Sequence, residues 1–166
     1  PRAAALAAVL AFCGSAHAQT TYYWDSNDST TGFGTAQGTW AAPTTNNSTQ
    51  GWSTSSTGVN AMSGTTTTTT SDALNFGTSA NQLATGTITV SGNVSANTIT
   101  LVGSTSNITL SGGNITLQGG LTATNSANTN AITDTISSNI TLGANQTWTI
   151  NNGGSTGTAN LAISGI

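Results

Sequence analysis

Short triplets in which a threonine lies between two apolar residues recur through the second half of the chain. They are Ile88-Thr89-Val90, Ile99-Thr100-Leu101, Ile108-Thr109-Leu110, Ile115-Thr116-Leu117, Ile140-Thr141-Leu142 and Trp148-Thr149-Ile150, and Leu161-Ala162-Ile163 continues the series with alanine. Because side chains alternate between the faces of a strand, this period of two predicts short strands with the apolar pair buried and the central residue outside. Glycine and asparagine between the triplets favour tight corners, since both tolerate positive φ.

Two all-β architectures fit this rhythm. A parallel β-helix stacks like strands on like strands, so the same triplet can repeat from one turn to the next. A β-sandwich needs regular hairpins and protected edges. We predict a right-handed parallel β-helix, with the β-sandwich as the alternative, and expect Asn and Thr at equivalent corners to form hydrogen-bonded ladders. Its rungs are assigned to residues 72–166 and are expected to continue beyond them, with no strand placed within residues 122–135.

Aromatic residues gather in the segment before these rungs. Residues 19–58 contain both tyrosines and three of the four tryptophans, namely Tyr22, Tyr23, Trp24, Trp40 and Trp52. Aromatic side chains bury the largest areas, so the segment is predicted to be an irregular cap that closes one end of the core. The alternative is an exposed platform of Trp24, Trp40 and Trp52 that binds a sugar. Residues 59–71 are rich in Ser and Thr and predict a loop, because the run 65–70 offers no apolar face.

The first residues have the pattern of an export signal. Arg2 precedes an apolar run over residues 3–12, and Ala16-His17-Ala18 provides a small-x-small cleavage site before Gln19. We therefore assign residues 1–18 to a signal peptide whose true start lies upstream of Pro1. A buried core helix and a lipoprotein signal ending at Cys13 are the alternatives. Secretion or exposure at the surface of a Gram-negative bacterium follows from this assignment.

Charge is nearly absent after this leader. Residues 19–166 contain no Lys, Arg, His, Cys or Glu, and their charged side chains are Asp25, Asp28, Asp72 and Asp134. A nucleic-acid partner is excluded because nothing would attract phosphate, and disulfides are excluded because the cysteine lies in the leader. General acid–base catalysis normally needs His, Lys, Cys or a tuned carboxylate. We therefore expect no enzyme and no cofactor, and assign no catalytic, cofactor-binding or metal-binding residue.

Three polar features of the sequence are candidate sites. Asp25-Ser26-Asn27-Asp28 could hold calcium, but Thr30 and Ala36 occupy the positions where a calcium loop of the EF-hand type has its glycine and closing carboxylate. A polar turn is the preferred interpretation. Asp72 and Asp134 could form a pair of carboxylates that cleaves polysaccharide, although no basic residue supports them. Triplets of the form Asn-x-Thr at Asn107, Asn114 and Asn139 match a glycosylation pattern and are better explained by the strand repeat.

The order of several blocks resembles the start of bacterial proteins with autotransporter-associated β-strand repeats. The blocks are Tyr22-Tyr23-Trp24-Asp25, Gly32-Phe33-Gly34, Gly38-Thr39-Trp40, Asp72-Ala73-Leu74-Asn75-Phe76-Gly77 and Ile88-Thr89-Val90-Ser91-Gly92-Asn93-Val94. The resemblance runs from Thr20 to the end, and the family's glycine-rich unit is reflected at Thr149-Ile150-Asn151-Asn152-Gly153-Gly154. It implies a secreted or surface-exposed β-helical passenger, delivered in many members through a C-terminal outer-membrane barrel and in others ending in a sorting signal.

The sequence therefore predicts an exported structural passenger that displays functions such as adhesion away from the cell. Its partner would be an unidentified surface ligand, with polysaccharide as one class. The first alternative is a carbohydrate-binding or carbohydrate-cleaving solenoid, which requires Trp24, Trp40 or Trp52 to be exposed in a groove. The second is a matrix protein that self-associates by edge-to-edge pairing at the Ile166 end.

Overall fold

The protein is an all-β coil with fourteen strands in its described residues. The computed structural model describes residues 18–59, 63–103, 105–126, 130–153 and 156–165. The strands are β1 (Thr21–Trp24), β2 (Thr39–Trp40), β3 (Thr44–Thr45), β4 (Trp52–Ser53), β5 (Thr65–Thr66), β6 (Ala73–Phe76), β7 (Gly86–Val90), β8 (Asn93–Gly103), β9 (Ile108–Ser111), β10 (Asn114–Asn125), β11 (Ala131–Ile136), β12 (Asn139–Leu142), β13 (Trp148–Asn152) and β14 (Thr158–Ile163). The predicted leader features Arg2, Cys13 and His17 lie outside the described residues.

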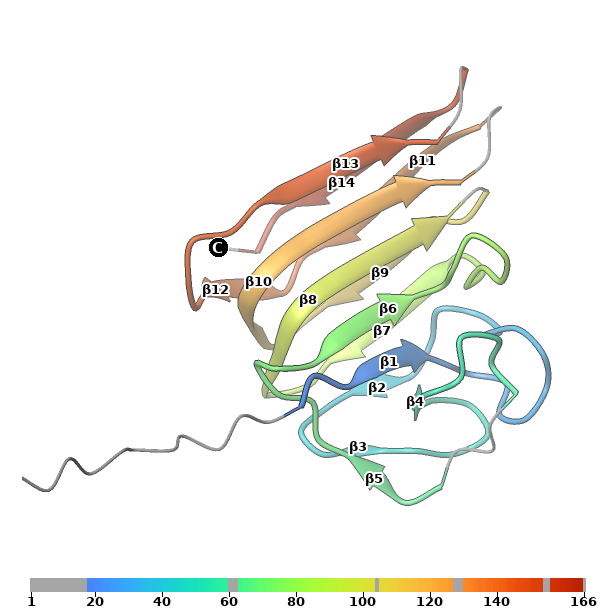
Figure 1. Cartoon of the computed structure of the whole chain (residues 1–166), viewed down its shortest axis with the longest axis vertical. Coiled ribbons are helices and arrows are strands. Elements are labelled where there is room, and N and C mark those ends of the chain that lie inside the picture. Colours follow the sequence, from blue (N-terminus) through green and yellow to red (C-terminus); the bar gives the residue numbers. More distant parts are fainter. Residues whose placement is uncertain (1–17, 60–62, 104, 127–129, 154–155, 166) are drawn as a thin grey trace, which may run out of the picture.

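From β6 to β11, successive strands alternate between two sheets that face each other. One sheet has the order β12-β10-β8-β6-β1-β4, with β13 also pairing with β10, and the other has the order β14-β11-β9-β7-β2. In Figure 1 strands β1, β6, β8, β10 and β13 run to the right in front, and the strands of the second sheet return behind them as the chain climbs, which makes the coil right-handed. The result is a β-solenoid of about three turns. The predicted parallel β-helix is confirmed, and the β-sandwich alternative is wrong.

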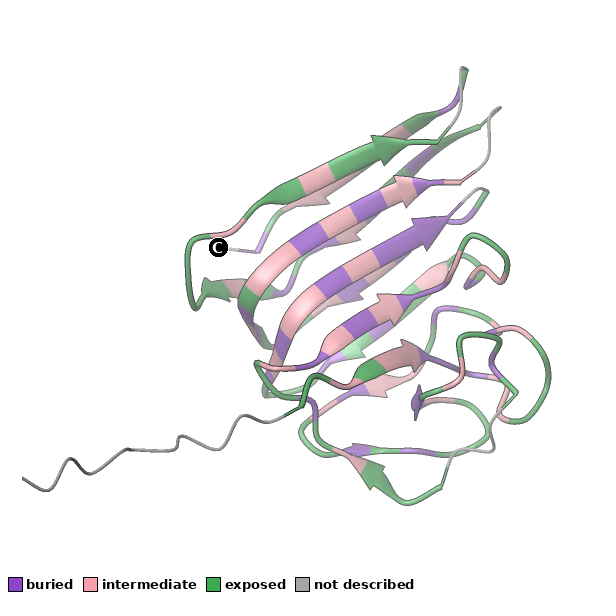
Figure 2. Ribbon diagram, viewed as in Figure 1, coloured by how far each residue is buried: buried purple, intermediate pink, exposed green. Residues whose placement is uncertain are grey.

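Segments with the same alternation of apolar and polar residues stack in register along the coil. Thr100 pairs with Asn75 on one side and Thr122 on the other, and Thr122 pairs with Thr149, so the outer face carries a polar column. The neighbouring inward column contains Leu74, Ile99 and Leu121, each at most 1% exposed. Figure 2 shows this alternation along β8 and β10. The apolar-threonine-apolar pattern thus predicted the strands, and it predicted their buried faces correctly for the triplets from Ile88 to Leu117 but wrongly for those of β12 and β13.

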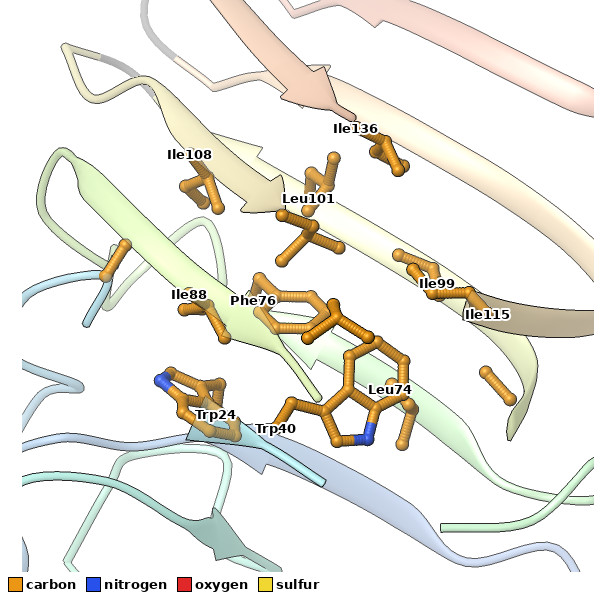
Figure 3. Packing of buried hydrophobic residues seen from close by; sticks show 14 of the residues in the cluster. Trp24, Trp40, Leu74, Phe76, Ile88, Ile99, Leu101, Ile108, Ile115 and Ile136 are labelled. Carbon is orange, nitrogen blue, oxygen red and sulfur yellow. The ribbon is translucent and has the colours of Figure 1, made fainter. Parts of the chain in front are cut away.

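The aromatic segment is the first coil of the solenoid as well as its cap. β1 and β2 extend the two sheets in parallel through β6 and β7, and β4 then pairs with β1 in the antiparallel direction. Trp52 on β4 contacts three rings edge-on, with centroid distances of 5.0 Å to Trp24, 5.6 Å to Trp40 and 5.6 Å to Phe76. Figure 3 shows Trp24, Trp40 and Phe76 at the base of the buried column. The rings fill the end of the core that aliphatic side chains continue.

Two stretches that predicted no strand contain strands. Residues 122–135 hold the end of β10 and most of β11, where polar residues alternate with buried Ala123, Asn125, Ile132 and Asp134. Part of the threonine run forms β5, which pairs with β3 in a small antiparallel sheet. Buried Thr68 accepts a hydrogen bond of 3.1 Å from the Trp40 indole nitrogen. In each case the stabilising contact comes from a strand or an aromatic ring elsewhere in the sequence, so the local sequence does not indicate it.

The last coil differs from the earlier ones in exposure. Leu142, Trp148 and Ile150 occupy inward positions of β12 and β13, yet they are 57%, 39% and 51% exposed. Their equivalents one coil earlier, Leu117 and Leu121, are at most 1% exposed. The difference arises because the described residues provide no further coil above β12–β14.

Candidate functional site

The three tryptophans considered as a sugar platform belong to the core. Trp24 and Trp40 are fully buried and Trp52 is 4% exposed. Their indole nitrogens are also satisfied inside the protein, by the main-chain oxygen of Gln37 for Trp24, by Thr68 Oγ1 for Trp40 and by Thr44 Oγ1 for Trp52. Since neither faces nor N–H groups are available to a ligand, these rings form the cap and no platform.

The acidic loop that follows β1 is held by a buried serine. Ser26 Oγ donates to the main-chain oxygens of Phe33 at 3.1 Å and Thr35 at 2.7 Å, and the Thr35 N–H donates back to it at 2.9 Å. Gly34 is required beside it, because its φ is +71° and a Cβ there would lie 2.5 Å from Ser26 Oγ. These contacts fold residues 25–35 back on themselves and fix the position of Asp25.

Several oxygen atoms converge inside this loop. The Asn27 side-chain amide faces Asp25 Oδ1 at 2.7 Å, the main-chain oxygen of Gly32 at 2.9 Å and that of Thr30 at 3.2 Å. The nitrogen is the amide atom that fits these three acceptors, and its two hydrogens are shared among them. With its oxygen turned toward them, the amide would place that oxygen against three other oxygens. The Asn27 N–H also donates to Asp25 Oδ1, at 2.9 Å.

Asp25 is fully buried, and its Oδ2 has no hydrogen-bond partner. Burial raises the pKa of Asp25 to about 6, the Asn27 N–H opposes this rise, and the charge of Asp28 adds to it. The loop is covered by residues 55–58: the Gly32 N–H donates to the Thr57 oxygen at 2.8 Å. A Cβ on Gly58 would collide with the Gly32 oxygen and lie 3.2 Å from Asp25 Oδ2.

Asp134 is a second buried carboxylate, in the other sheet. It lies in an inward column of β11 beside Ile108 and Leu161, and its Oδ1 accepts a 2.8 Å bond from the Ile108 N–H. Its Oδ2 is buried without a partner. Burial raises the pKa of Asp134 to about 6, and the Ile108 bond opposes this rise.

The structure does not bring Asp72 and Asp134 together. Asp72 precedes β6 in the front sheet, and its carboxylate accepts bonds from the Thr69 N–H at 2.7 Å, the Thr69 hydroxyl at 2.8 Å and the Thr20 N–H at 3.4 Å. Asp134 lies on β11 in the opposite sheet with a separate partner. The two carboxylates have separate hydrogen-bond donors, so the pair that glycoside cleavage would need is not formed.

Asparagines of the Asn-x-Thr triplets link successive coils. Asn114 Nδ2 donates to Asn93 Oδ1 at 2.7 Å, and Asn139 Nδ2 donates to Asn114 Oδ1 at 2.9 Å. Asn107 Oδ1 accepts from the Thr133 N–H at 2.9 Å. The expected ladder is therefore present, and the repeat explains these triplets.

The exposed end of the coil contains a shallow hollow. Its lining comprises Leu142, Gly143, Ala144, Asn145, Gln146 and Trp148. The Trp148 indole donates to Gln146 Oε1 at 3.0 Å, which holds the ring at the rim. Sequence reasoning did not single out this surface, because the same triplets are buried in earlier coils.

The chain matches no protein-family model, no curated protein and no solved structure. In the described part of the chain, no helix is long and apolar enough to cross a bilayer. The features that bear on function are therefore the solenoid, its two buried carboxylates and its exposed end.

Proposed function

We propose that this chain is an exported structural module that displays functions away from a bacterial cell. The observation that carries the proposal is the outer surface of the solenoid, where polar columns such as Asn75, Thr100, Thr122 and Thr149 stack coil on coil. These side chains are neutral, and a separate ladder of Asn93, Asn114 and Asn139 joins successive coils by side-chain hydrogen bonds. A stiff neutral support is the function that such a surface fits best.

Two further facts favour a structural role for the chain rather than catalysis or sugar binding. The buried tryptophans leave the carbohydrate alternative without the groove it required, and Asp72 and Asp134 act in separate sheets. The resemblance to passengers with autotransporter-associated repeats agrees with export followed by display. Adhesion to a surface ligand would then depend both on the outer surface of the module and on the functions that the module displays.

Expression of the chain in a Gram-negative host, with an initiating Met added, tests export. We expect the mature protein outside the cytoplasm, beginning at Gln19 by mass spectrometry. Leu10→Arg should leave the uncut chain in the cytoplasm, because a charge interrupts the apolar run, while Leu10→Ile should be processed normally. Equal cytoplasmic retention of the unchanged chain and both variants would contradict the proposal.

A self-associating module is the second candidate, favoured by the exposed end. Leu142, Trp148 and Ile150 lie beside outer edges of β12 and β13 that have no strand neighbour among the described residues. An unpaired edge with apolar side chains favours pairing with another chain. Ile166 itself lies outside the described residues.

A further inference from the structure

We propose that the loop of residues 25–32 binds a calcium ion through the Asp25 carboxylate, the side-chain oxygen of Asn27 and the main-chain oxygens of Thr30 and Gly32. This proposal is independent of export, since it concerns a site inside the folded chain.

The first support is the convergence of oxygens described above. Asp25 Oδ1, the Gly32 oxygen and the Thr30 oxygen all lie 2.7–3.2 Å from one atom of the Asn27 amide. Oxygens that share a calcium ion at about 2.4 Å come within roughly this distance of one another. Carboxylate, amide and carbonyl oxygens are also the ligand types that calcium prefers.

The second support is the unpartnered oxygen of Asp25. Oδ2 is buried with no donor, and no side chain in residues 19–166 carries a positive charge that could pair with it. A buried carboxylate oxygen without a partner is costly, and a cation from solution is the partner that this composition leaves open. Asp28 adds a second negative charge close enough to act on Asp25.

Residues 55–58 cover this side of the loop. The Gly32 N–H donates to the Thr57 oxygen, and glycine at position 58 permits the close approach, because a Cβ there would collide with the Gly32 oxygen and lie 3.2 Å from Asp25 Oδ2. In the empty loop, the Asn27 nitrogen would satisfy the three oxygens. Calcium would then require the amide to turn over so that its oxygen faces the ion.

The main readout is the melting temperature in calcium compared with EDTA. With few charged ligands we expect a dissociation constant of about 1 mM, in the range of weak extracellular sites. About 10 mM Ca²⁺ should then raise the melting temperature by roughly 3–5 °C. The same concentration of Mg²⁺ should change it by about 1 °C or less, because Mg²⁺ gives up its water reluctantly.

Asn27→Asp is the sharpest variant because it adds charge without changing shape. If the Asn27 oxygen is a ligand, this change should tighten calcium binding at least about tenfold by titration calorimetry, since ligand charge sets affinity. Asn27→Ala should weaken binding about tenfold or more for the same reason. Asn47→Asp is the matched control: it makes the same exchange in an exposed turn, where Asn47 Oδ1 accepts from Thr49, and should leave calcium affinity unchanged.

Terbium luminescence excited through tryptophan gives an independent readout, because Trp24 adjoins Asp25. We expect a signal that calcium displaces and that Asn27→Ala removes. Three results would overturn the proposal: no stabilisation by calcium, equal stabilisation by magnesium, or equal calcium affinity in Asn27→Asp and Asn47→Asp. The last result would show that Asn27 acts only as an internal donor.

Discussion

Asp134 stands where the solenoid otherwise places an apolar side chain. Its neighbours in the inward column are Ile108 and Leu161, and one of its two oxygens has no partner. The pKa of this carboxyl is raised from 3.8 to about 6, so the folded protein holds the proton more tightly than the unfolded chain. The stabilisation from that proton is present below about pH 4 and is lost as the pH rises through about 6.

Asp134→Asn should therefore stabilise the protein at alkaline pH. A shift of about two pH units corresponds to roughly 3 kcal/mol, so we expect the melting temperature at about pH 8 to rise by roughly 6–12 °C. At about pH 4 the variant and the unchanged protein should melt within about 2 °C of each other, since both are neutral there. Thermal unfolding followed by circular dichroism at the two pH values measures the difference.

Asp72→Asn provides a control of opposite sign. The Asp72 carboxylate accepts three hydrogen bonds from Thr69 and Thr20 through both of its oxygens, so an amide in its place would turn its own N–H group toward at least one of these donors. This replacement should lower the melting temperature at about pH 8. Destabilisation by both variants at that pH would contradict the account of Asp134.

The asparagine ladder is the element that joins successive corners of the coil. Asn114 occupies its centre, where it both donates to Asn93 and accepts from Asn139. Asn114→Ala removes both bonds and should reduce the free energy of unfolding by about 1–2 kcal/mol. Asn114→Asp keeps an acceptor for Asn139 and loses the donor to Asn93, so it should cost less. Urea denaturation of the two variants measures the ranking.

Asn145→Ala is the matched control for this ladder. Asn145 is exposed in the loop between β12 and β13, and the change should alter stability by at most about 0.5 kcal/mol. If Asn114→Ala and Asn145→Ala were equally stable, the ladder would contribute nothing measurable.

At the level of strands, the triplets predicted strands because each one contains the alternation of apolar and polar residues that is typical of a strand. β11 was missed because its text, Ala-Ile-Thr-Asp-Thr-Ile, places a carboxylate in an inward position. β5 was missed because Thr65 and Thr66 have no apolar neighbour and become a strand through pairing with β3. In both cases a nonlocal partner outweighs the local signal.

At the level of the whole molecule, the two ends of the coil are unlike. β4 and the aromatic rings close one end, whereas Leu142, Trp148 and Ile150 stay exposed at the other. For a chain limited to residues 19–166, analytical ultracentrifugation should therefore show association that increases with protein concentration. The double variant Trp148→Ser and Ile150→Thr should weaken that association about tenfold or more by removing apolar contact area.

Val59→Ser is the control for this prediction. Val59 is another exposed apolar residue, at 46%, but it lies in the loop after β4, away from the last coil. It should leave association unchanged. A chain that stays monomeric at all concentrations, or that responds equally to both sets of changes, would contradict association through the exposed end.

The sequence by itself determined the strand triplets, the coil that stacks them and the asparagine ladder, because periodic alternation and repeated text act locally and recur in each turn. It also indicated that catalysis by basic residues is absent from residues 19–166. The tertiary structure alone decided which tryptophans are buried, that Asp72 and Asp134 lie in different sheets, and that the Asn27 side-chain amide faces Asp25 Oδ1 and the main-chain oxygens of Thr30 and Gly32. Those outcomes depend on how the chain folds back between coils. Because the loops between coils differ in length, no repeating pattern in the sequence predicts that geometry.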